Sequence, residues 1–268
     1  MQFALNQATS PNLNFAEFLD LAANLGCVGV EPRNDMKRPL FDGLPASVAG
    51  QMVRDRGLEI VGLSQVYPFN DWSPERRREI VDLAETARQC GAPGINLIPR
   101  VDGIGTDPDE CRGSLRMIII DLRPILADLN VGGWIEPIGF EKSSIRIKRV
   151  LAEIIEELGA GDHFGLIHDT FQHTIAADPD IFAAQTALVH ISGISHPDVP
   201  LDESQDAHRV LIDETDRVGN VTQIIELQRR GYRGPFSFEC TEPAIHALPD
   251  LESRLERSMN FLRARIAV

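Results

Sequence analysis

The chain has 268 residues, of which 43% are hydrophobic and 25% are charged. This composition supplies enough apolar surface for one large core and excludes an intrinsically disordered protein. The formal net charge of −14 argues against nucleic-acid or anionic-membrane partners, because like charges repel. A neutral or cationic small molecule suits this surface better.

Short apolar runs typical of β-strands alternate with amphipathic helices along the whole chain. Such alternation is the sequence pattern of a parallel sheet built from βα units. The eight expected strands span residues 3–6, 28–31, 60–64, 95–98, 133–136, 164–169, 187–192 and 235–239.

The expected helices carry apolar stripes and start signals. The first helix places Phe15, Phe18, Leu19, Ala22 and Leu25 on one face, suited to packing on a barrel. Capping side chains or a proline at the first helical position are predicted at Asn14 with Glu17, Asn220 with Gln223, Ser73-Pro74 and Asp178-Pro179.

No linker or low-complexity segment divides the sequence, so residues 1–268 are expected to form a single domain. Eight βα units predict an α/β fold, a single (β/α)8 TIM barrel, with a doubly wound open sheet as the alternative. No Gly-x-Gly-x-x-Gly turn follows the first strand, which disfavours a dinucleotide-binding sheet. The long irregular stretch 194–219 is typical of a lid or binding loop.

The N-terminal residues enter the first expected strand without a basic leader, and no apolar run approaches the ~18 residues of a membrane span. We therefore expect a cytoplasmic protein that makes no membrane contact. The four cysteines show no Cys-x-x-Cys spacing, which argues against a thiolate metal site. The oligomeric state stays open, a homo-oligomer included.

Four expected strands end on residues that can bind a metal ion: Glu136, Asp169, His190 and Glu239. In a parallel barrel these ends meet at the carboxyl rim, where barrel enzymes hold their active sites. Three carboxylates and one imidazole suit Mn²⁺, Mg²⁺ or Co²⁺, with Zn²⁺ as a further candidate. Without a cation, three converging carboxylates would resist ionising together.

A charged residue at a strand end is often only a solvated rim residue. Four ligand-type residues in one half of the barrel favour a metal site over that interpretation. Side chains alternate along a strand, so His168 should point away from Asp169 and serve packing or hydrogen bonding instead.

These residues and several segments resemble the xylose-isomerase-like TIM barrels, and most closely their 2-keto-myo-inositol (inosose) isomerases of inositol catabolism. The resemblance covers essentially the whole chain and is carried by residues 3–6, 29–35, 69–72, 97–100, 136–140, 168–171 and 189–193. It implies a divalent metal, Mn²⁺ foremost, held by Glu136, Asp169, His190 and Glu239. It also implies proton transfer by Glu136 and Glu239 through an enediolate of a small polyhydroxy ketone.

The resemblance also points to substrate contacts. Gln172 stands where the superfamily often has a substrate-binding His, and His173 follows it, so either residue is a candidate. His196 takes the place of a basic residue after the seventh strand. Further candidates at strand ends are Asn6, Glu31, Gln65, Arg100 and Lys142, with Phe69, Trp72 and Phe140 as an apolar wall.

The same residues serve an inosose dehydratase or a keto-sugar 3-epimerase, and sequence does not separate these from an isomerase. An endonuclease IV-like phosphodiesterase is disfavoured, because it needs more metal ligands and a basic groove. A non-catalytic sugar-binding barrel is the remaining alternative, and metal analysis would distinguish it.

Overall fold

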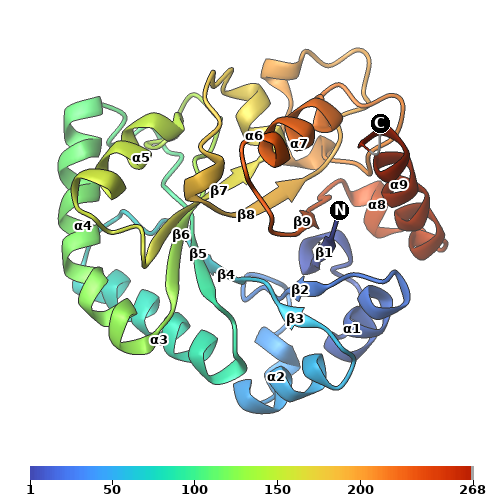
Figure 1. Cartoon of the computed structure of the whole chain (residues 1–268), viewed down its shortest axis with the longest axis horizontal. Helices are drawn as coiled ribbons and strands as arrows, with labels where there is room; N and C mark the ends of the chain where they lie inside the picture. The colour runs from blue at the N-terminus through green and yellow to red at the C-terminus, as the bar shows by residue number, and fades with distance from the viewer. Residues whose placement is uncertain (267–268) are drawn as a thin grey trace.

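In the computed structural model, which describes residues 1–266, nine parallel strands form a central barrel enclosed by helices (Figure 1). The strands are β1 (Phe3–Asn6), β2 (Gly29–Glu31), β3 (Glu59–Ile60), β4 (Leu63–Val66), β5 (Gly94–Leu97), β6 (Gly132–Ile135), β7 (Phe164–Asp169), β8 (Thr186–Ile191) and β9 (Phe236–Phe238). Their hydrogen-bonded order is β3-β2-β1-β9-β8-β7-β6-β5-β4.

The third expected strand is divided into two short pieces. β3 pairs with β2 through Ile60 and Val30, whereas β4 pairs with β5 through Leu63 and Ile95. β3 and β4 stand at opposite ends of the strand order, yet only residues 61–62 separate them in the chain. Together they occupy one strand position of the barrel and close it, because β3 pairs with one edge of the sheet and β4 with the other. The expected (β/α)8 barrel is therefore confirmed, and the doubly wound alternative is wrong.

Helices cover the outside of the barrel between successive strands (Figure 1). They are α1 (Phe15–Asn24), α2 (Ala46–Arg54), α3 (Pro74–Cys90), α4 (Pro108–Leu129), α5 (Lys148–Glu157), α6 (Thr170–Ile175), α7 (Asn220–Arg229), α8 (Pro243–His246) and α9 (Leu251–Ile266). The expected starts of α1 and α3 are confirmed by the Asn14–Glu17 capping box and by Ser73 with Pro74.

Two expected helix starts are wrong because tertiary partners take the side chains. Gly219, rather than Asn220, caps α7, and the Asn220 amide donates to the Ser192 carbonyl at 2.9 Å. No helix begins at Pro179, and the Asp178 carboxylate instead accepts from the Lys148 ammonium at 3.1 Å.

Trp134 fills the amino end of the barrel interior. A Cβ at Gly94 would lie 2.4 Å from the Trp134 indole, and one at Gly132 would lie 2.5 Å from it. These glycines leave the space that the ring occupies. Trp134 and Glu136 share one face of their strand, so this inward placement directs Glu136 toward the barrel interior at the opposite end.

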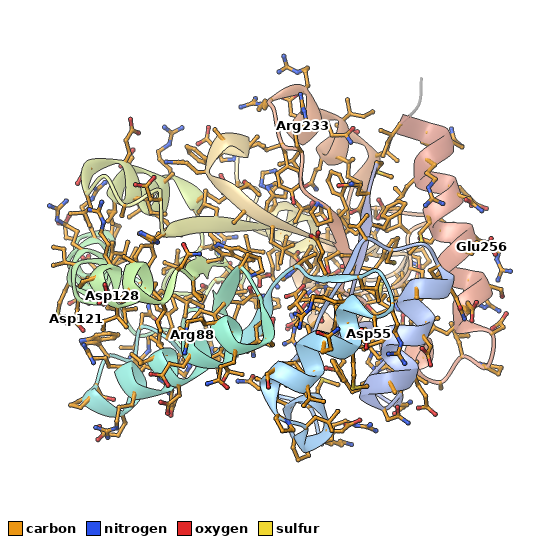
Figure 2. The ribbon with its side chains drawn as sticks, turned by 60° about the horizontal axis from the view of Figure 1, so that its bottom comes forward. Asp55, Arg88, Asp121, Asp128, Arg233 and Glu256 are labelled. Carbon is orange, nitrogen blue, oxygen red and sulfur yellow. The ribbon has the colours of Figure 1, made fainter. Side chains whose placement is uncertain are left out.

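Charged side chains lie on the outer faces of the helices, as Figure 2 shows for Asp55, Asp128 and Glu256. All four cysteines are buried free thiols. Among the described residues, no helix is long and apolar enough to cross a membrane.

The close crossing of α2 and α3 provides a test of the packing. A Cβ at Gly50 would lie 2.1 Å from the Cys90 carbonyl oxygen. Gly50→Ala should therefore lower the free energy of unfolding by ~1–3 kcal/mol, because the two backbones must separate. Urea denaturation measures this change.

Gly113→Ala in α4 is the matched control, because a Cβ there meets nothing within 4 Å. It should raise the free energy of unfolding by ~0.5–1 kcal/mol, since alanine is the better helix former. Wild-type stability in Gly50→Ala would show that the helices do not cross this closely.

Candidate metal centre

The carboxyl ends of β6, β7, β8 and β9 bring the four expected ligands together. One ligand atom from each of Glu136, Asp169, His190 and Glu239 lies within 4.8 Å of the others. The four residues are only 4%, 1%, 1% and 5% exposed. Neighbouring strands of the sheet thus build one buried cluster from residues that are spread between positions 136 and 239 of the sequence.

The imidazole of His190 is oriented by a carboxylate beneath it. Its Nε2 atom lies 3.0 Å from the Glu31 carboxylate, whereas Nδ1 lies 3.3 Å from Glu239 and 3.5 Å from Glu136. Within residues 1–266, buried Nδ1 has no hydrogen-bond partner. A histidine that bonds a carboxylate through one nitrogen and leaves the other unpartnered is typical of a metal ligand.

The charge of the cluster also fits a cation. Burial raises the pKa of Glu136 to about 7; Glu239 and Asp169 add to this rise, and His190 opposes it. Against burial, which lowers it, Glu31, Glu239 and Glu136 raise the pKa of His190 well above its usual range. Three oxygen donors and one nitrogen suit Mn²⁺, Mg²⁺, Co²⁺ or Zn²⁺, so the residues fit a divalent ion at this position.

Two arginines that were not among the expected site residues contact the cluster. Arg33, just after β2, donates to Glu239 Oε1 at 2.6 Å. Arg209 donates through Nη2 to Asp169 at 2.5 Å and to Glu239 Oε2 at 2.9 Å. Glu136 has no such guanidinium partner among the described residues.

The sequence carried only a partial signal for these arginines. Arg209 lies in the 194–219 stretch expected to be a binding loop, and Arg33 lies in the 29–35 segment that carries the family resemblance. Against burial, which raises it, His190, Arg209 and Arg33 hold the pKa of Glu239 well below its usual range. The two glutamates of the cluster therefore differ in their surroundings.

A cavity of about 280 Å³ opens above the cluster, and we call it the site cavity. Glu136 and Glu239 line it, whereas Asp169 and His190 do not. One part of its wall is polar, from Arg33, Gln65, Gln172, Asp206, Arg209 and Thr241. Another part is formed by Tyr67, Ile98, Val101, Ile138 and Phe140. The combination suits a small ring with one apolar face and polar substituents.

Of the expected substrate contacts, Gln172 and Asn6 lie at the site. Gln172 lines the site cavity, and its side-chain oxygen accepts from the Gly139 amide at 2.8 Å. Asn6 is fully buried, and its amide lies 3.4 Å from Glu239 Oε1. Gln65 and Phe140 also line the cavity.

Two expected contacts, Glu31 and His173, do not line the site cavity. Glu31 is fully buried below His190 and also accepts hydrogen bonds from Ser64 and Ser237, so it orients the ligand instead. His173 Nδ1 lies 2.8 Å from the Lys148 ammonium. The His173 ring is tilted against that of His168, with the two ring centroids 4.8 Å apart. Neither residue lines the site cavity, so a substrate contact by Glu31 or His173 stays a prediction.

His168 behaves as strand alternation predicts. It is fully buried outside the cluster, and its Nε2 lies 2.9 Å from the Gln223 side-chain oxygen. Gln223 was expected to take part in a helix cap with Asn220. Its side chain instead contacts His168, which explains both the missing cap and the partner of His168.

The remaining candidates lie outside the site cavity. Arg100 pairs with Asp102 at 2.7 Å, and His196 lies 3.5 Å from Glu242. Trp72 packs against the hydrophobic core, and exposed Lys142 lines a neighbouring cavity. Fully buried Phe69 also packs into the core. The structure does not bring these residues to the four-residue cluster.

Solved structures share the whole fold. A xylose isomerase domain containing protein from Salmonella typhimurium is 28% identical, with a TM-score of 0.88 over 100% of this chain and 97% of that one. The IolI protein with a bound zinc atom is 17% identical, with a TM-score of 0.87 over 100% and 98%. The 3-keto-D-glucoside 4-epimerase YcjR from E. coli is 16% identical, with a TM-score of 0.69 over 98% and 99%.

No curated protein matches the chain at the sequence level. The model of one protein family, however, matches residues 19–265, which is nearly the full length. With the closed barrel and the cluster at its carboxyl rim, this match identifies the chain as a member of the xylose isomerase-like TIM barrel family.

Proposed function

We propose that the protein is a divalent-metal-dependent isomerase of a cyclic or open-chain α-hydroxy ketone, with 2-keto-myo-inositol as the first candidate substrate. The proposal places it in the cytoplasm and in inositol catabolism. The solved relatives support the reaction class, because one is an IolI protein with bound zinc and another is an epimerase of a keto-glucoside.

Some residues of the cluster line the site cavity and others do not, and this difference carries the proposal. Across β9, β8, β7 and β6 the residues follow in the order Glu239, His190, Asp169, Glu136, so the two glutamates flank the other two. Only these two glutamates line the site cavity. A substrate in the cavity would therefore meet a carboxylate on each side, which suits proton transfer by two acid–base groups.

The residues perform the reaction by moving a proton between two carbons. One glutamate removes the proton from the hydroxyl-bearing carbon beside the ketone, and the electron pair of that C–H bond forms the enediolate. A proton then returns to the former carbonyl carbon from the second glutamate, while the hydroxyl proton passes to the former carbonyl oxygen. Both carboxylates are nearly buried, so each proton moves through a glutamate, and the two glutamates exchange protons with water between turnovers.

Glu136, Asp169, His190 and Glu239 would hold the metal, with Mn²⁺ as the first candidate. When bound, a divalent ion polarises the ketone and stabilises the negative charge that develops on its oxygen. Asp169 and His190 lie behind the cavity wall, so their part is to anchor the ion. Gln172, Arg33 and Arg209 line the wall and restrict how the substrate lies.

The dehydratase alternative uses the same residues and differs only in losing a β-hydroxyl from the enediolate. Incubation of 2-keto-myo-inositol with protein and Mn²⁺ separates the two reactions. Isomerisation conserves mass, whereas dehydration releases water and forms a conjugated dione that absorbs ultraviolet light. A mass spectrum therefore detects dehydration, and the NMR spectrum of the reaction mixture detects an isomer of unchanged mass.

Removing either proton-transfer group should abolish most turnover. Glu136→Gln and Glu239→Gln should each lower kcat by ~10²–10⁴-fold, because general acid–base catalysis contributes that much. Steady-state kinetics on 2-keto-myo-inositol measures the loss. Glu256→Gln on the exposed face of α9 is the control and should retain full activity. Wild-type turnover by Glu239→Gln would exclude its role in proton transfer.

Metal addition should stabilise the folded protein. A ligand that binds only the folded state adds ~2.7 kcal/mol at 100 times its Kd, so Mn²⁺ should raise the Tm of metal-free protein. Asp169→Asn should lose most of this rise, although Asn can still accept from the Gln172 amide as a helix cap. An unchanged Tm of the wild type with Mn²⁺, Mg²⁺, Co²⁺ and Zn²⁺ would contradict the metal site.

The carboxylate below His190 should tune metal affinity without touching substrate. Glu31→Gln keeps the size and an acceptor for Nε2 but removes the charge, so metal affinity should fall by ~10–100-fold. Competition with a coloured chelator measures the Kd. Glu59→Gln, an exposed change on β3, is the control. Equal affinities for wild type and Glu31→Gln would show that Glu31 does not support the ligand.

A further inference from the structure

A second cavity of about 620 Å³ adjoins the site cavity and shares Val101 and Phe140 with it. We call it the outer cavity; its wall includes Gly139, Phe140, Lys142, Arg146, Glu203 and Gln205. We propose that the outer cavity is a subsite for a neutral sugar ring, joined by a glycosidic bond to the ketone ring that reacts in the site cavity. This inference rests on the proposed function, which places the reacting ketone beside Glu136 and Glu239.

The sizes of the two cavities favour a substrate of two units. The site cavity, at about 280 Å³, lies just below the ~300–1,000 Å³ that is typical of ligand pockets. The outer cavity, at about 620 Å³, falls within that range. Val101 and Phe140 line both cavities, so the two cavities lie next to each other at these side chains.

The chemistry of the outer wall suits a sugar. The half-buried ring of Phe140 offers an apolar face to the C–H side of a sugar ring. Lys142 and Arg146 offer donors to hydroxyl groups, and Glu203 and Gln205 offer acceptors.

The charge of the outer wall selects a neutral ring over an anionic one. The cations Lys142 and Arg146 are opposed by the carboxylates Glu141, Asp202 and Glu203. Two positive and three negative charges give a formal −1, which disfavours a phosphate or carboxylate on the second unit.

The backbone that carries Phe140 is held in place before any ligand binds. Arg146 donates to the Gly139 carbonyl at 2.8 Å and to the Ile175 carbonyl at 3.2 Å. Gln172 accepts from the Gly139 amide, and a Cβ at Gly139 would lie 2.2 Å from the Gln172 carbonyl oxygen. This close contact fixes the backbone before Phe140, and a wall already in position reduces the ordering cost of binding.

A matched pair of ketones tests the subsite. Metal-loaded wild type should show a kcat/KM for 3-ketotrehalose at least ~10-fold above that for 3-ketoglucose, because binding energy from the second ring assists the reaction of the first. Glu203→Trp should fill part of the outer cavity and bring this ratio close to one, with kcat/KM for 3-ketoglucose unchanged. Glu256→Trp on the exterior of α9 (Figure 2) is the control and should keep the wild-type ratio.

Equal kcat/KM values for the two ketones in wild type, or an unchanged ratio in Glu203→Trp, would overturn the subsite. If neither ketone reacts, turnover of 2-keto-myo-inositol decides the proposed function, and calorimetric binding of 3-ketotrehalose decides the subsite separately. Weaker binding by Glu203→Trp than by Glu256→Trp would support it. Equal binding by the two variants, or no binding by wild type, would overturn it.

Discussion

The convergence of three carboxylates in a nearly water-free space is the constraint on which the rest of the site depends. Burial penalises each negative charge, and neighbouring charges add to the penalty. Positive groups offset this penalty. His190 lies at the centre of the cluster, and Arg33 and Arg209 lie beside Glu239. Among the described residues Glu136 forms an ion pair only with His190, which leaves room for the charge of a metal ion.

The barrel places the residues that would anchor the metal apart from the residues that would transfer protons. Neighbouring parallel strands place Asp169 and His190 between the two glutamates, so the anchoring residues lie behind the residues that face the cavity. The strands supply this geometry from a rigid scaffold, whereas long loops supply the wall that meets the substrate. Substrate choice can then change through those loop residues that do not contact the cluster, whereas Arg33 and Arg209 line the wall and also bind cluster residues.

Strand alternation and strand order sufficed to predict the barrel and the four clustered residues, because each ends a strand at the same rim. They also placed His168 outside the cluster. The sequence could not show that Glu31 lies beneath His190, since that depends on the depth of β2 in the barrel. Nor could it show that Arg209 reaches back to Asp169, because a loop has no periodicity from which to infer its path. Gln172 and His173 are neighbours in a short helix, and only the structure shows that Gln172 lines the site cavity whereas His173 does not.

The account depends most directly on proton transfer at the carbon beside a ketone. We would incubate 2-keto-myo-inositol with Mn²⁺-loaded protein in D₂O and follow the ketone by NMR and mass spectrometry. The account predicts deuterium at the carbon beside the carbonyl with no loss of water, and no enzyme-dependent incorporation with Glu136→Gln or Glu239→Gln. Isomerisation of the ketone without deuterium incorporation, or equal enzyme-dependent incorporation by the wild type and both variants, would contradict the account.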